Sequence, residues 1–116
     1  MDKTFIADQY IAETNTLIVD FSDGSTSVYD LSQLIPKRIK SVVALDNYIL
    51  QLEFDNHEIK LYNMTNSLTG VFEFLNDVKE FQQVKLIQDN QAIGWQCQGE
   101  IIDLWVDSLY YHSYQK

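Results

Sequence analysis

Cysteine and long apolar runs are scarce in this chain. Cys97 is the only cysteine among 116 residues, so an internal disulfide cannot form. The sequence has no run of about eighteen consecutive apolar residues, the length that a membrane-spanning helix requires. Its first residues carry neither a basic segment nor an apolar export segment. We therefore expect a cytoplasmic protein that is not embedded in a membrane.

Positive charge is also scarce. Eight Lys and Arg residues stand against seventeen Asp and Glu residues, which gives a formal net charge of −9. Such a surface repels phosphate backbones and anionic lipid headgroups, so we expect neither nucleic-acid binding nor membrane binding. The one basic cluster, residues 37–40 after Pro36, is interpreted as a solvated connector. The acidic balance suits a basic partner protein.

Residues that could carry chemistry are few. His57 and His112 are the only histidines, and neither has Cys or carboxylate residues at metal-ligand spacing. Cys97 has no neighbouring base or cation that would activate its thiol. Asp107 is expected to cap a final helical turn, and Asp103 is not expected to share a helix face with it. We expect no catalytic, cofactor-binding or metal-binding residues, and no enzymatic activity.

The strongest pattern present is an internal repeat at an offset of thirty-three residues. It relates Leu17, Phe21 and Tyr29 to Leu50, Phe54 and Tyr62. Each copy is predicted to contain three strands, the first of them at residues 3–12 and 38–45, where Ile6 and Ile39 also correspond.

The turns of the two copies are predicted at Asp23-Gly24 and Asn56-His57. Asp-Gly favours a two-residue type I′ turn, which would place Phe21 opposite Thr26 and Phe54 opposite Ile59. With this register Val28 and Leu61 face the core. Lys60, Tyr29 and Tyr62 then lie on the polar face of their hairpins.

In the later part of the chain the spacing of apolar residues changes from that of a strand to that of a helix. Apolar residues at helical spacing predict a short helix over residues 71–82, with Asn76 or Asp77 as its N-cap. Residues 84–88 and 92–98 are predicted to form another hairpin. The predicted fold is α+β, a mainly antiparallel sheet with one or two short helices on one face. It forms a single domain over residues 1–116, with a first unit at 1–35 and a second at 38–116.

Several segments resemble a known family. They are 42–48 (VVALDNY), 49–54 (ILQLEF), 59–63 (IKLYN), 70–75 (GVFEFL), 81–84 (FQQV) and 93–95 (IGW), followed by Asp103 and 107–110 (DSLY). In this order they are similar to the small bacterial proteins grouped as domain of unknown function 2442, over roughly residues 40–113. The resemblance implies a single α+β domain without an established catalytic set. It also implies an association with small companion proteins in arrangements that look like toxin and antitoxin pairs. The first thirty-five residues add a degenerate extra hairpin unit.

Aromatic residues supply the candidate interaction surface. Tyr29 and Tyr62 serve either cross-strand packing or partner recognition, and Trp105 and Tyr110 are further candidates. The preferred hypothesis is a non-enzymatic interaction module that binds a basic partner, in the manner of an antitoxin, or a second copy of the chain. The alternative is a small-molecule-binding regulatory domain with a pocket between the sheet and the helix at 71–82.

Overall fold

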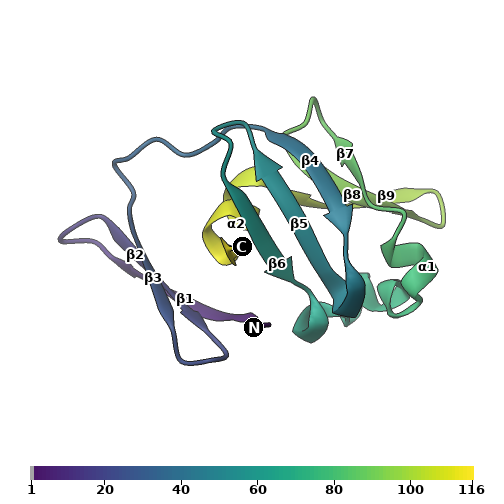
Figure 1. The fold of residues 1–116 in the computed structure, drawn as a ribbon, viewed down its shortest axis with the longest axis horizontal. Coiled ribbons are helices and arrows are strands. Elements are labelled where there is room, and N and C mark those ends of the chain that lie inside the picture. The colour runs from purple at the N-terminus through teal and green to yellow at the C-terminus, as the bar shows by residue number, and fades with distance from the viewer. Residues whose placement is uncertain (1) are drawn as a thin grey trace.

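Three antiparallel sheets form the framework of the protein (Figure 1). The structure is a computed structural model that describes residues 2–116. The first sheet, called the meander, contains β1 (Phe5–Ile11), β2 (Thr16–Phe21) and β3 (Thr26–Asp30) in that order. Residues 31–38, the connector, lead from the meander to the rest of the chain, which we call the body.

The body contains the other two sheets. One has the strand order β10-β6-β5-β4, and the other has the order β7-β8-β9. Their strands are β4 (Ile39–Ala44), β5 (Ile49–Phe54), β6 (Ile59–Asn63), β7 (Lys85–Ile87), β8 (Ala92–Cys97), β9 (Glu100–Trp105) and β10 (Tyr114–Gln115). The predicted α+β class, with mainly antiparallel pairing, is confirmed.

The helices are short. They are η1 (Asp46–Tyr48), η2 (Thr65–Ser67), η3 (Gly70–Asn76), α1 (Val78–Phe81) and α2 (Val106–His112). The predicted helix at 71–82 is broken into η3 and α1 by the extended backbone of Asp77. Asp77 caps α1, because its carboxylate accepts a hydrogen bond from the Lys79 N–H at 3.0 Å. The predicted cap at Asp107 is wrong: Trp105 occupies the cap position of α2, and Asp107 lies inside its first turn.

The turn of each repeat has three residues, not two. In the first copy the Phe21 N–H donates to the Ser25 carbonyl at 3.0 Å. In the second copy the Phe54 N–H donates to the Glu58 carbonyl at 2.9 Å. The third turn residue is left-handed in both copies, with φ of +86° at Gly24 and +73° at His57. The predicted two-residue turns are therefore wrong in both copies.

The extra turn residue exchanges the inward-facing and outward-facing residues of the second strand of each hairpin. Because side chains alternate between faces, a shift of one residue exchanges the inner and outer sets. Tyr62 now lies opposite Leu50, and Lys60 lies opposite Leu52, so both face the core. Val28, predicted to face inward, is 66% exposed. The predicted polar face at Lys60 and Tyr62 is thus the buried one.

The backbone nevertheless confirms the repeat. Leu17 pairs with Tyr29 as Leu50 pairs with Tyr62, and a bulge interrupts the first strand pair at the same place in each copy. Phe5 lies opposite Phe21 in the position that Ile39 has opposite Phe54. The predicted correspondence of Ile6 with Ile39 is off by one residue in this strand, because Ile6 is exposed whereas Ile39 is buried.

Replacing His57 by glycine is expected to stabilise the protein. A non-glycine residue in the left-handed region costs about 1–2 kcal/mol, and glycine avoids this cost at the expense of more freedom in the unfolded chain. His57 is exposed and occupies the position that Gly24 has in the first copy. We expect His57→Gly to raise the free energy of unfolding by about 0.5–1 kcal/mol in urea titrations. Gly24→Ala should have the opposite sign, and a destabilised H57G protein would contradict the argument.

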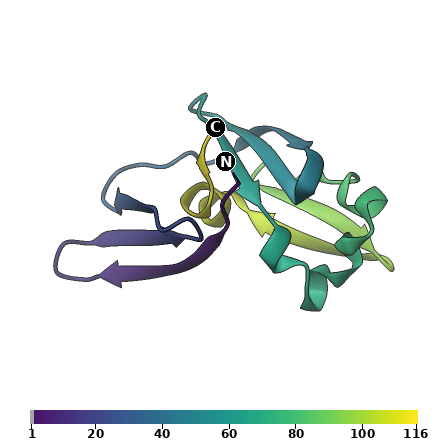
Figure 2. The same cartoon turned by 60° about the horizontal axis from the view of Figure 1, so that its bottom comes forward.

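Two hydrophobic clusters hold the chain together. The larger lies inside the body and includes Leu52, Phe54 and Trp95. The smaller joins the meander to the body through Val19 and Phe21, which pack against Tyr114 of β10. Helix α2 lies between the meander and the β7-β8-β9 sheet, and the two chain ends lie close together (Figures 1 and 2). Among residues 2–116, no helix has the length and apolar character needed to cross a membrane.

Candidate functional site

The four residues predicted to form an interaction surface lie in three different environments. Tyr62 is buried in the body, which corrects its predicted exposure. Tyr29 and Tyr110 are half-buried and contact each other, with ring centroids 5.9 Å apart. Trp105 is 42% exposed at the end of β9. The structure therefore brings Tyr29 and Tyr110 together and places Trp105 on a separate surface.

Tyr29 and Tyr110 belong to the contact between the meander and the body, which we call the seam. At its centre lies Lys60, whose side chain is only 1% exposed. The Lys60 ammonium donates to the Tyr29 hydroxyl at 2.8 Å and to the Tyr110 carbonyl at 2.6 Å. It also lies 4.1 Å from the centroid of the Tyr110 ring, within the range of a cation–π interaction. One buried cation thus binds groups from both sides of the seam.

Burial at the seam changes the protonation of its residues. It lowers the pKa of the Lys60 ammonium from 10.5 to about 8, an effect that the Glu58 carboxylate partly opposes. Burial raises the pKa of the Tyr29 and Tyr110 hydroxyls, and for Tyr110 the Glu58 carboxylate adds to this rise. The sequence interpretation missed Lys60 because the assumed two-residue turn placed it on the polar face.

The histidines and the cysteine have ordinary surroundings. His112 stacks on Phe5 with centroids 3.7 Å apart, and its Nε2 lies 2.8 Å from the Asp8 carboxylate. His57 lies in an exposed turn, and Cys97 is half-buried. Among residues 2–116, no group of three or more His, Cys, Asp or Glu side chains is placed to hold a metal ion.

Exposed apolar and acidic side chains alternate along β9. We define the β9 face as Ile101, Asp103 and Trp105, which alternate along the strand and are all exposed. Ile101 is 47% exposed. In the part of the chain that the structure describes, β9 pairs with β8 alone and is an edge strand. An edge strand can accept a further strand along its open side.

Gly94 of β8 shapes the surface beside the β9 face. A methyl group at Gly94 would lie 2.7 Å from Ile87 Cδ1 and 3.2 Å from Ile101 Cγ2. The two isoleucine side chains therefore close over the glycine and make contact with the backbone below. A side chain at position 94 would displace Ile87 and press on Ile101 of the β9 face.

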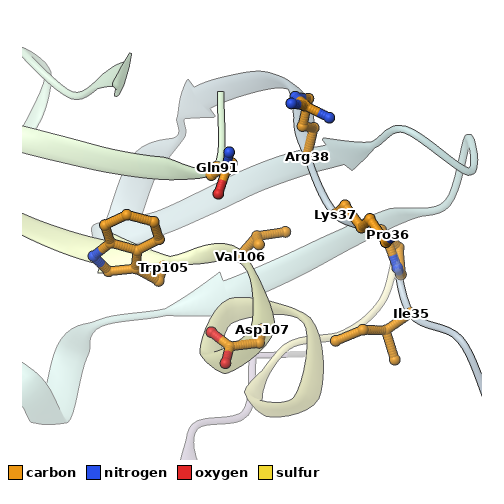
Figure 3. A pocket seen from close by; sticks show the side chains of 8 residues that line it. All are labelled: Ile35, Pro36, Lys37, Arg38, Gln91, Trp105, Val106 and Asp107. Carbon is orange, nitrogen blue, oxygen red and sulfur yellow. The ribbon is translucent and has the colours of Figure 1, made fainter. Parts of the chain in front are cut away.

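A groove adjoins the β9 face where the connector passes the start of α2 (Figure 3). This connector groove has a volume of about 420 Å³. It is lined by residues 35–38, Gln91 and residues 105–107. The Arg38 guanidinium is already paired with the Asp89 carboxylate at 2.9 Å. Trp105 thus belongs both to the β9 face and to the wall of the groove.

A second hollow lies at the place predicted for a small-molecule pocket. It has a volume of about 330 Å³, and its lining includes Phe74, Asp77 and Glu80 from the η3 and α1 segment. Residues 96–98 at the end of β8 form its other side. The lining combines the apolar Phe74 ring with the carboxylates of Asp77 and Glu80, so this hollow suits a small molecule that has both an apolar and a polar part.

A known family model matches the body but not the meander. The family model described as "Protein of unknown function (DUF2442)" matches residues 39–115. This chain belongs to the DUF2442 family. The resemblance inferred from the sequence over residues 40–113 is confirmed. Comparisons with curated proteins and with solved structures find no match.

The bounds of the DUF2442 match show which part of the chain supplies each surface. The match begins with β4 and ends with β10, so the meander and the connector precede the DUF2442 domain. The β9 face belongs wholly to that domain. The connector groove combines DUF2442 residues with residues 35–38 of the connector. The seam likewise combines residues of the two parts, since the Tyr29 hydroxyl of the meander accepts a hydrogen bond from Lys60 of the domain.

Proposed function

We propose that this DUF2442 protein is a non-enzymatic interaction module that binds a small basic partner protein, as an antitoxin binds its toxin. The observation that carries the proposal is the β9 face. It presents two large apolar side chains, Ile101 and Trp105, on an unpaired strand edge with Asp103 between them. Interfaces typically combine exposed apolar anchors with complementary charge.

The charged side chains of β9 and of the start of α2 are all acidic. Glu100, Asp103 and Asp107 are exposed along the strand and at the start of α2. The segment from Glu100 to Ser108 contains no Lys, Arg or His residue. A partner strand that pairs with the β9 edge would satisfy its open backbone groups, and basic side chains on that strand would face the carboxylates. This geometry supports a basic partner in preference to an acidic or nucleic-acid partner.

The proposal predicts a salt-sensitive complex that depends on Asp103. Affinity capture of the intact chain at low salt should isolate one small basic protein, and the purified pair should bind in calorimetry. Because charges at an exposed interface are screened, the affinity should fall as the salt concentration rises. Asp103→Lys should weaken the complex about tenfold or more, which corresponds to roughly 1.4 kcal/mol.

The matched control is Asp20→Lys on the outer face of β2, where Asp20 is also exposed but lies on the meander. It makes the same change in net charge and should leave the affinity nearly unchanged. Equal losses in the two variants would show a nonspecific charge effect. Failure to recover any basic protein at low salt would reject the interaction proposal.

The second proposed function is small-molecule binding in the hollow beside η3 and α1. The observation in its favour is the position of that hollow, lined by Phe74, Asp77 and Glu80 against the end of β8. A ligand that binds the folded state raises the melting temperature. This alternative is favoured if a small molecule raises the melting temperature of the unchanged protein but not that of Glu80→Ala. It also requires that the protein captures no partner protein.

A further inference from the structure

We propose that the connector groove receives an arginine side chain of the basic partner, stacked on the Trp105 indole and paired with the Asp107 carboxylate. This inference rests on the proposed function and deepens it. It names one side chain of the partner and the place where that side chain binds. Trp105 would then contact the partner twice, at the β9 face where a partner strand pairs and in the groove where the arginine side chain binds.

The lining of the groove contains an indole and a carboxylate, the two kinds of group that a guanidinium contacts. Figure 3 shows the Trp105 indole at the end of β9 and the Asp107 carboxylate in the first turn of α2, with Ile35, Pro36 and Lys37 of the connector on the other side of the groove. The indole is 42% exposed, so part of its surface is open to a ligand. The Asp107 Oδ1 accepts the Ser108 N–H at 2.8 Å, which holds the carboxylate in place and leaves Oδ2 for a second donor.

Arginine fits this environment better than lysine does. A guanidinium is planar and weakly hydrated, and it can stack on an aromatic ring while one of its N–H groups donates to a carboxylate oxygen. Its stem of three methylene groups would lie against the apolar side chains of Ile35, Pro36 and Val106. The volume of about 420 Å³ lies within the range of ordinary ligand pockets and accommodates one side chain with part of its backbone.

The cations that already line the groove set a limit on its affinity. Arg38 is neutralised by Asp89. Lys37 is exposed, has no carboxylate within ion-pair distance among residues 2–116, and lies on the opposite side of the groove from Trp105 (Figure 3). It therefore repels an incoming guanidinium. Replacing Lys37 by a negatively charged residue should therefore strengthen the binding of arginine. The same replacement should weaken the binding of an anion at this place.

The test uses the intact protein and N-acetyl-L-arginine amide, which carries one positive charge and no carboxylate. The protein has two tryptophans, so its nitrogen-correlated NMR spectrum contains two indole N–H signals, and Trp105→Phe identifies the one from Trp105. We expect the Trp105 signal to shift with a dissociation constant in the millimolar range. The signal from buried Trp95, whose indole donates to the Phe81 carbonyl at 2.9 Å, should stay in place.

Three variants make the test directional. Asp107→Asn should weaken the binding of N-acetyl-L-arginine amide at least threefold, and Lys37→Glu should strengthen it about threefold. Lys85→Glu is the matched control, because Lys85 is exposed on β7 and the substitution changes the net charge equally. The remaining backbone signals of each variant confirm that it is folded.

Two results would overturn the inference. One is a Trp105 signal that does not respond to N-acetyl-L-arginine amide or that responds equally in the Lys37→Glu and Lys85→Glu variants. The other is a response to N-acetylglycine that Lys37→Glu abolishes, which would make the groove an anion site. In either case a partner complex that still requires Asp103 would leave the proposed function standing, so the two failures are distinguishable.

Discussion

Replacing Phe54 by alanine is expected to lower the free energy of unfolding by about 3–5 kcal/mol, as the truncation of a buried aromatic residue in a tight core does. Phe54 is completely buried in the body and packs edge to face with Tyr110, with ring centroids 5.2 Å apart. Its loss leaves a cavity beneath both β5 and α2. Since those elements carry the main core, the whole body should unfold at a lower urea concentration.

The corresponding substitution in the first copy should have a local effect. Phe21 occupies the same place in the repeat, but it packs in the smaller cluster with Val19 and Tyr114. We expect Phe21→Ala to release the meander while the body stays folded. Hydrogen exchange should accelerate at Val19, whereas the urea transition followed by Trp95 fluorescence should move by less than about 1 kcal/mol.

This pair of substitutions tests whether the two clusters are separate units of stability. Both remove the same side chain from equivalent positions of one repeat, so each serves as the control for the other. A single cooperative transition, shifted equally by Phe21→Ala and Phe54→Ala, would contradict the separation.

The stability of the protein is expected to rise between pH 8 and pH 10. The pKa of Lys60 is about 8 in the folded protein and 10.5 in the unfolded reference, so between these values the unfolded chain binds the extra proton. Stability increases with pH wherever the unfolded state binds more protons. A shift of this size corresponds to a gain on the order of 3 kcal/mol from Lys60.

The tyrosines of the seam reverse this trend at higher pH. Burial raises the pKa values of Tyr29 and Tyr110 above 10, so above pH 10 the folded protein retains protons that the unfolded chain releases. Stability should therefore pass through a maximum near pH 10 and then fall. Urea titrations at half-unit intervals from pH 7 to pH 11 would map the maximum.

Lys60→Met should remove the alkaline rise. The apolar side chain avoids the cost of burying a charge, and replacing a buried charge by an apolar residue of similar size is often neutral or stabilising. The Tyr110 carbonyl retains the Ser113 hydroxyl as a donor at 3.2 Å. We expect a change within about 1 kcal/mol at pH 7 and a flat profile from pH 8 to pH 10.

Lys40→Met is the control, because Lys40 is exposed and its ion pair with Glu53 lies at the surface. It should leave the alkaline rise intact. A rise that persists in the Lys60→Met protein would mean that another group causes it.

The sequence predicts the strands and the repeat because these depend on local patterns. Alternation of apolar and polar residues indicates the strands, and the recurrence of Leu17 and Phe21 as Leu50 and Phe54 shows that one hairpin is duplicated. The length of the two turns was predicted incorrectly. Asp23-Gly24 fits a two-residue turn, yet Gly24 occupies the left-handed position of a three-residue turn.

The candidate sites depended on information that local patterns do not contain. Lys60 was misplaced because a shift of one residue exchanges the two faces of a strand. The connector groove could not be predicted, since it forms where residues 35–38 pass Trp105 and Asp107 in the folded chain. The residue Trp105 was a candidate from the sequence, but only the fold shows that it has an open strand edge on one side and a groove on the other.

Helix α2 has one further consequence, because it contacts the connector groove, the main core and the meander. Its first residues line the connector groove, Leu109 packs in the main core, and Tyr110 and Tyr111 contact Tyr29 of the meander. A ligand that favours one position of this helix must change the docking equilibrium of the meander. By thermodynamic reciprocity, docking must change the affinity for that ligand by the same factor. The seven residues of α2 therefore link the proposed partner site to the meander.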